Sequence, residues 1–283
     1  MKPNALITVL GDDLLAQFRE TPLLDEYAVY EQLLSYWHEV MHDDVFLVMH
    51  DGWEGAAKPR VTIEDKTRKL KEDPDLVIGS GKNAVKYKTD LIPPALVVAR
   101  YFAAEQAAVD ALAGAADEAA RDLDEHLEEH SGDEGLLAEA AGDNGKVTKA
   151  LVDKRVKAVK QEIKDGSGDT DELAALETAA NLFKADAAAK KAFKNAQTEL
   201  DETTLRKYGE LTEDEIKTLV LDAKWHGTVA QRSASEAESL TLALVARIQE
   251  LGRRYERTLS ETAQLVTALD GRLARHLATM GVS

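Results

Sequence analysis

The sequence predicts a mainly α-helical protein, in which long antiparallel helices form a coiled-coil or bundle-like tail behind a small α/β N-terminal portion. All six prolines lie before residue 95, and because proline breaks helix interiors, the rest of the chain is free to form long helices. Much of the 44% hydrophobic content is alanine and only 5% of the residues are aromatic, which favours close helix packing over a thick core. Beyond residue 212, apolar residues recur every three or four positions, as on one face of a helix.

The N-terminal third combines short elements of both kinds. Residues 4–18 and Asp25 to His42 are predicted helices, the second with an apolar face and with Asp25 as its cap. Compact apolar or β-branched runs predict strands at Val45–Met49, Leu76–Ile78 and Val85–Thr89.

Pro93-Pro94 marks the predicted boundary, because proline is favoured at the first position of a helix. We expect residues 1–93 to form the small α/β portion and residues 94–283 to form a long-helix assembly domain. Three helices are expected after the boundary, from Ala95 to about His130, from Lys146 to Lys164 and from Thr170 to about Arg206.

The last part of the chain carries the candidate interface. Thr212 and Glu215 have the spacing of a capping box, and Gly227 is expected to mark a break or kink. The fifty or so residues beyond it predict one helix of roughly 75 Å, at about 1.5 Å per residue. Such a helix must lie against another long helix, in this chain, in a partner or in a second copy when the chain is isolated. Its predicted partner-binding residues are Leu251, Tyr255, Leu259, Val266, Leu269 and Leu273.

The formal net charge of −17 is unevenly distributed. Residues 104–203 carry 24 Asp/Glu against 12 Lys/Arg, which should repel DNA, whereas residues 58–88 hold nine Lys/Arg against five acids. A local basic patch is enough for phosphate contacts, although a solvated loop explains the same composition. The predicted DNA-binding residues are Lys66, Arg68, Lys69, Lys71, Lys82, Lys86 and Lys88.

His38-Glu39-Val40-Met41-His42 has the spacing of a zinc-hydrolase motif, in which two histidines share a helix face and the glutamate activates bound water. Glu64 could supply a third ligand, but its position is unspecific. No histidine follows at the spacing of the extended motif, so two polar helix positions are the simpler interpretation. We expect no metal, and keep a zinc hydrolase as an alternative function.

The amino-acid composition also limits which other classes of protein this chain can belong to. The chain has no cysteine, which excludes disulfides and thiolate metal sites. No apolar run approaches the roughly 20 residues of a membrane span, and the N-terminus lacks a signal-peptide pattern. A cytoplasmic protein is therefore expected.

Five stretches together resemble the C-terminal part of the modification subunit of type I restriction–modification systems, which are N6-adenine DNA methyltransferases. They run from Pro22 to Tyr30, from Tyr36 to Phe46, from Asp90 to Phe102, from Lys207 to Thr212 and from Leu219 to Trp225. The resemblance implies that the tail helices pack on the specificity subunit, in a complex that also holds a second modification subunit and DNA. It also implies that residues 38–42 belong to a helix that joins the catalytic domain to the tail, which would explain the motif without a metal.

The same resemblance implies that this chain holds no catalytic residue. The family's Asn-Pro-Pro-Tyr/Phe motif is represented only by Ile92-Pro93-Pro94-Ala95, and the glycine-rich S-adenosylmethionine loop is absent. We therefore expect a methyltransferase as the parent protein and no cofactor in this chain. A free-standing coiled-coil scaffold is the remaining alternative.

Overall fold

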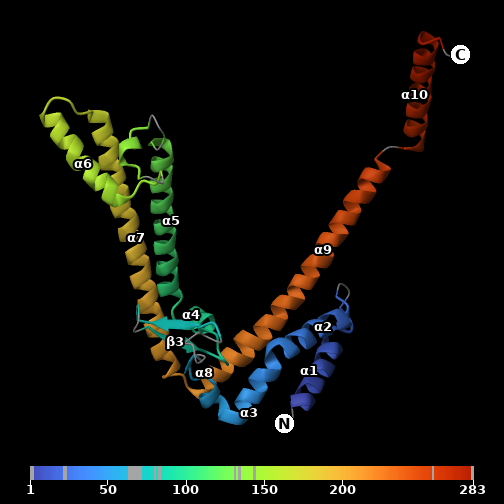
Figure 1. Ribbon diagram of the computed structural model, residues 1–283. Coiled ribbons are helices and arrows are strands. Elements are labelled where there is room, and N and C mark those ends of the chain that lie inside the picture. The colour runs from blue at the N-terminus through green and yellow to red at the C-terminus, as the bar shows by residue number, and fades with distance from the viewer. Residues whose placement is uncertain are drawn as a thin grey trace. The chain divides into compact units, whose positions relative to one another are not determined.

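The computed structural model describes residues 3–21, 24–62, 72–79, 81, 84–130, 132, 135–142, 145–256 and 258–281, and it confirms the mainly α-helical class. The residues group into two compact units, Met1–Phe46 with Trp225–Ser283, and Leu47–Lys224 (Figure 1). The expected boundary at residue 93 lies inside the second unit. No helix in the described ranges has the length and apolarity that a membrane crossing requires.

The first unit begins with a helical hairpin. Helix α1 (Pro3–Phe18) packs against α2 (Glu26–Tyr36), and the side chain of Asp25 caps α2 by accepting from the Tyr27 amide at 2.9 Å. A π-helical turn, η1 (Trp37–Met41), continues into α3 (His42–Ala56). Both predicted helices of this region are confirmed.

The predicted strand Val45–Met49 is wrong, because these residues lie within α3. Met41, Asp44 and Val45 are buried whereas Phe46 is exposed, which is the spacing of a helix face. A short apolar run cannot be assigned to strand or helix by periodicity alone. Here the preceding helix continues through it, with Asp43 and Asp44 in the first turn of α3.

The second unit contains a three-stranded antiparallel sheet. Strands β1 (Arg60–Val61), β2 (Leu76–Ile78) and β3 (Val85–Lys88) lie in the order β1-β3-β2, with Leu76 opposite Tyr87 and Arg60 opposite Lys88. The strands predicted at residues 76–78 and 85–89 are confirmed, and the two-residue β1 was not predicted.

The expected helix at 95–130 is divided at Phe102, whose φ of −132° and ψ of 31° are not helical. Helix α4 (Pro94–Tyr101) precedes the break and α5 (Ala103–His130) follows it. Helix α7 (Thr170–Tyr208) lies antiparallel along α5 (Figure 1), so the long antiparallel pair is as predicted.

The far end of this pair is closed by a small apolar cluster, which we call the coil tip. A 3-10 turn, η3 (Ala138–Ala140), and helix α6 (Lys149–Lys164) pack there against α7. The buried members of the coil tip are Leu137, Ala140, Val152, Val159, Ala175, Leu176, Ala179 and Ala180.

The turn from α6 to α7 depends on two glycines. Gly166 has a φ of 82°, in the left-handed region that favours glycine. A Cβ on Gly168 would lie 2.5 Å from the Ile163 backbone nitrogen, closer than a side chain can approach. This turn lets α6 fold back on α7 and bury its apolar face.

The C-terminal stretch is not one long helix. Helix α8 (Glu213–Lys217) is followed by a π-helix, η4 (Thr218–His226), and then by α9 (Gly227–Tyr255) and α10 (Leu259–Thr279). Gly227 marks a change of helix type, and the break falls instead between Tyr255 and Leu259. A capping box of Thr258 and Glu261, in which each bonds the other's backbone amide, starts α10 afresh.

The capping box predicted at Thr212 is confirmed, and it has a third participant. The Glu215 carboxylate accepts from the Thr212 amide at 2.9 Å, from the Tyr101 hydroxyl at 2.9 Å and from the Thr212 hydroxyl at 3.0 Å. These hydrogen bonds, the Thr212 amide foremost, lower the pKa of Glu215 from 4.5 to about 2.

We expect Tyr101→Phe to raise the pKa of Glu215, because it removes one donor to the ionised form. Since the folded pKa is depressed, the stabilisation from Glu215 is present above pH 4.5 and is lost as the pH falls towards 2. An NMR pH titration of the side-chain carboxyl measures this directly. Glu261 is the internal control, because its capping box has no tyrosine and its pKa should not move.

Candidate functional site

The first half of α9 is held against α2 within the first unit. Arg232 pairs with Glu39 and lies over the Tyr36 ring, with 5.0 Å from the guanidinium carbon to the ring centroid. The Trp225 indole donates to the buried Asp44 carboxylate at 2.8 Å, and Ser233 is buried. Arg232 and Ser233 thus mark the packing face of α9, whereas the Trp225–Asp44 contact joins η4 to α3 just before it.

Beyond residue 237 the same face is uncovered. Leu240 follows the buried Ser233 by seven residues, which is two helical turns, so the two side chains lie on one face. That face then carries Leu244, Ile248 and the partly exposed Leu251, and ends at Tyr255, which is 71% exposed. The internal packing face of α9 therefore continues as an exposed apolar stripe.

Helix α10 carries a second length of apolar surface. Alternating steps of three and four residues separate Leu259, Thr262, Val266, Leu269, Leu273, His276 and Met280. This is the heptad pattern of a helix that packs on another helix. Val266, Leu269 and Leu273 are each more than half exposed, and Leu259 is 92% exposed.

We call these two lengths together the α9–α10 stripe. Five of the six predicted partner-binding residues are exposed in it, and Leu251 is partly exposed. They lie on two helices rather than on the single helix that was expected. Leu240, Leu244 and Ile248 extend the surface towards the packed end of α9, and the three-to-four residue spacing in the sequence already indicated them.

Each large apolar side chain of this surface would gain roughly 1.5–3 kcal/mol on full burial. Contiguous exposed apolar patches of more than a few hundred Å² are uncommon on monomeric proteins and mark interaction sites. The side chains of the stripe are mainly aliphatic and recur at steps of three or four residues, which fits another amphipathic helix as its partner.

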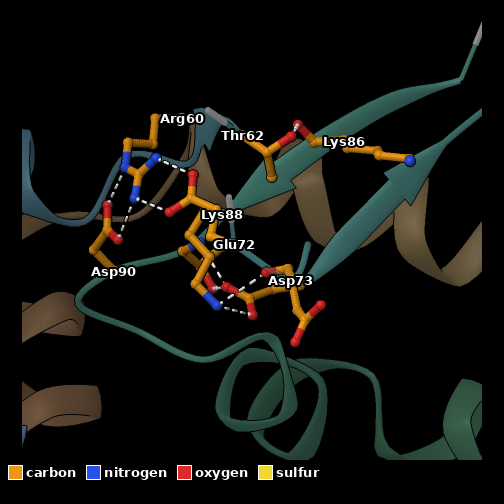
Figure 2. A network of polar contacts seen from close by, with 9 residues as sticks. Arg60, Thr62, Glu72, Asp73, Lys86, Lys88 and Asp90 are labelled. Carbon is orange, nitrogen blue, oxygen red and sulfur yellow. Dashed lines mark hydrogen bonds and ion pairs between the residues drawn. The ribbon is translucent and has the colours of Figure 1, made fainter. Parts of the chain in front are cut away.

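The predicted DNA-binding segment is only partly described, since Lys66, Arg68, Lys69, Lys71 and Lys82 lie outside the described residues. Lys88 is engaged within the unit: its ammonium donates to the Asp75 carboxylate at 2.8 Å and to the Asp73 carbonyl at 3.2 Å (Figure 2). The ammonium of Lys86 extends away from this network (Figure 2). Of these two lysines, only Lys88 has its ammonium held in this network.

Arg60 belongs to the same network. It forms two-pronged hydrogen bonds with Glu72, at 2.6 and 2.8 Å, and with Asp90, at 2.6 and 2.9 Å (Figure 2). These bonds join β1 to the segments before β2 and after β3. The charge of Arg60 is thereby neutralised, which weakens the positive potential of the basic segment.

The His38–His42 motif lies on η1 and the start of α3. Glu39 pairs with Arg232 and accepts from the Ser35 hydroxyl at 2.8 Å, and the Arg232 bond is the main reason that its pKa is lowered to about 2. The His42 ring packs edge-on against Phe46, with 4.7 Å between centroids. Among the described residues, no three His, Cys, Asp or Glu side chains converge as metal ligands would. Glu39 thus serves as an ion-pair partner that joins η1 to α9.

Comparison with known proteins gives no match for this chain among protein families, curated proteins or solved structures.

Proposed function

We propose that this chain is an assembly and DNA-positioning region of a type I restriction–modification N6-adenine methyltransferase, acting in the cytoplasm. Its α9–α10 stripe would pack on the helices of the specificity subunit, in a complex with a second modification subunit and DNA. The chain itself would carry neither catalytic residues nor S-adenosylmethionine, which belong to the methyltransferase domain of the parent protein.

The α9–α10 stripe is the observation that carries this proposal. The packing face of α9 continues past the α1–α2 hairpin as an uncovered face, and α10 repeats an apolar heptad with none of its residues buried. Helices of this kind gain most of their stability from packing an apolar face rather than from propensity. The choice of partner rests on the sequence resemblance, which implies that the specificity subunit supplies the helices that cover this face.

Replacing Leu269 and Leu273 by Asp should abolish co-purification with the specificity subunit, because each substitution would bury an unpaired carboxylate in the interface between the two proteins. The helix content should be unchanged, since both positions are exposed in the isolated chain. Affinity capture after co-expression, with circular dichroism of the isolated variant, measures both outcomes.

The matched control is the pair Gln264→Asp and Ala268→Asp. These residues are also four apart on α10 and exposed, but they lie outside the heptad positions, and the pair adds the same charge. The control variant should still assemble. Normal assembly of the Leu269/Leu273 variant would show that the interface is elsewhere, and wild-type dimers with no specificity-subunit binding would favour a free-standing scaffold.

A further inference from the structure

A second surface, formed by lysines of α6 and α7, lies in the otherwise acidic second unit. Helix α6 carries six Lys/Arg against two Asp/Glu, and its apolar face is held in the coil tip by Val152, Val159 and Ile163. The five lysines of α6 are all exposed. On one flank the residues 149, 153, 157, 160 and 164 follow each other at helical spacing, and all except Asp153 are lysines.

An ion pair shows that α7 shares this flank. The Lys160 ammonium lies 2.8 Å from the Glu177 carboxylate, so the lysine flank of α6 and the Glu177 side of α7 border the same surface. Lys184 and Lys191 follow Glu177 at steps of seven residues, which returns them to its side of α7. We call the combined surface the lysine strip: Lys149, Lys157, Lys160, Lys164, Lys184 and Lys191.

The strip retains most of its charge. Asp153 and Glu177 are the acids on the flank, and Glu177 is already paired with Lys160. Lys149, Lys157, Lys164, Lys184 and Lys191 are exposed, and none forms an ion pair with a carboxylate in the described ranges. Arg155, by contrast, is bound on a different side of α6 by Glu139, Glu162 and Glu172.

The acidic helix α5 lies on another side of α7. His126 of α5 lies 3.0 Å from the Ala175 carbonyl, and α5 itself carries nine Asp/Glu against one Arg. Glu177 is two residues beyond Ala175, which places it on nearly the opposite side of α7. The group of helices α5, α6 and α7 therefore has an acidic side along α5 and a basic side along α6 and α7, and Figure 1 shows α5 and α6 against different sides of α7.

We propose that the lysine strip binds the phosphate backbone of double-stranded DNA without reading its sequence. Sequence-independent contacts of this kind need flexible cations along a surface and no base-reading groups. A protein partner fits less well, because protein interfaces are depleted in lysine and centre on apolar or aromatic residues. On the α7 flank, Ala188 lies between Lys184 and Lys191, and the polar Asn195 follows Lys191.

This inference deepens the proposed function by adding a DNA contact outside the basic segment 58–88, but its test needs only the chain itself. Fluorescence anisotropy with a labelled duplex of about 25 base pairs should show binding at about 50 mM salt, with Kd on the order of 10⁻⁵ M. The affinity should fall with salt at a log–log slope of about −0.9 per phosphate contact, or about −4 for four to five contacts.

Reversing two charges of the strip, Lys157→Glu with Lys191→Glu, should lower the affinity at least about tenfold and flatten the slope by about two units. The control pair, Arg19→Glu with Arg121→Glu, changes the net charge equally at exposed positions outside the strip. Circular dichroism should show both variants folded.

Three results would overturn the proposal: no duplex binding at low salt, equal weakening by both pairs, or a strip-dependent dimer in sedimentation that replaces duplex binding. The last result would assign the strip to the acidic α5 of a second copy. Loss of DNA binding with intact co-purification leaves the proposed function standing, because the strip and the α9–α10 stripe use different residues.

Discussion

Replacing Leu176 by alanine is expected to lower the free energy of unfolding by about 3–5 kcal/mol, near the upper end for buried leucines. Leu176 is fully buried in the coil tip, where its neighbours include Val152, Val159 and Ala179. The alanines around it have no flexible side chain to fill the space, so the cavity would remain open. Unfilled volume adds to the lost transfer free energy.

The loss should appear first as local opening of the coil tip. Hydrogen exchange of α6 amides should accelerate, because α6 is held mainly through this cluster. Thermal melting by circular dichroism measures the total effect. Leu259→Ala is the control, since Leu259 is 92% exposed and its replacement should change stability by less than about 0.5 kcal/mol. Equal exchange rates in α6 of the Leu176 variant and the wild type would contradict the assignment of Leu176 to the tip core.

The double replacement Tyr208→Phe with Lys224→Met is expected to destabilise the second unit by about 2–5 kcal/mol. The Tyr208 hydroxyl donates to the Ile92 carbonyl and the Lys224 ammonium to the Leu91 carbonyl, both at 2.6 Å. Both donors are buried, and burial raises the pKa of Tyr208, which keeps it a neutral donor. Without them, two adjacent buried carbonyls lose these hydrogen bonds.

A double-mutant cycle in urea separates the two contributions. Each single variant should cost about 1–3 kcal/mol, and the two carbonyls belong to neighbouring residues, so a coupling of at least about 0.5 kcal/mol is expected. If the two free-energy changes were strictly additive, the two hydrogen bonds would stabilise the Leu91–Ile92 segment before Pro93 independently of each other. Tyr101→Phe is a suitable control for the loss of a tyrosine hydroxyl, because its acceptor, the Glu215 carboxylate, keeps other donors.

Local signals in the sequence account for what was predicted correctly. The Thr212 and Asp25 caps, the uninterrupted α7 and the strands β2 and β3 all follow from residues within a few positions of each other. The break before α10 also had such a signal, since Thr258 and Glu261 have capping-box spacing. However, Tyr255 and Leu259 keep the four-residue step of one continuous stripe, which favours a single helix in the sequence.

Other features depend on contacts that no local pattern contains. The division at Phe102 involves neither proline nor glycine, so no local signal in the sequence marks it. The sequence predicts that Lys88 contacts DNA, and in the structure its ammonium donates to Asp75, thirteen residues earlier and just before the neighbouring strand β2. The lysine strip was missed because its two halves are brought together by the fold of α6 on α7.

The separate capping box at the start of α10 determines where the chain can tolerate insertions and deletions. Because Thr258 and Glu261 satisfy the first amides of α10 locally, that helix needs no hydrogen-bond partners from α9. A residue gained or lost between Glu256 and Thr258 would leave both helices intact and change only the phase between their apolar faces. The same insertion within α7 would rotate every later side chain by about 100° against α5. Length changes between homologous chains should therefore collect at this junction and be absent from α7.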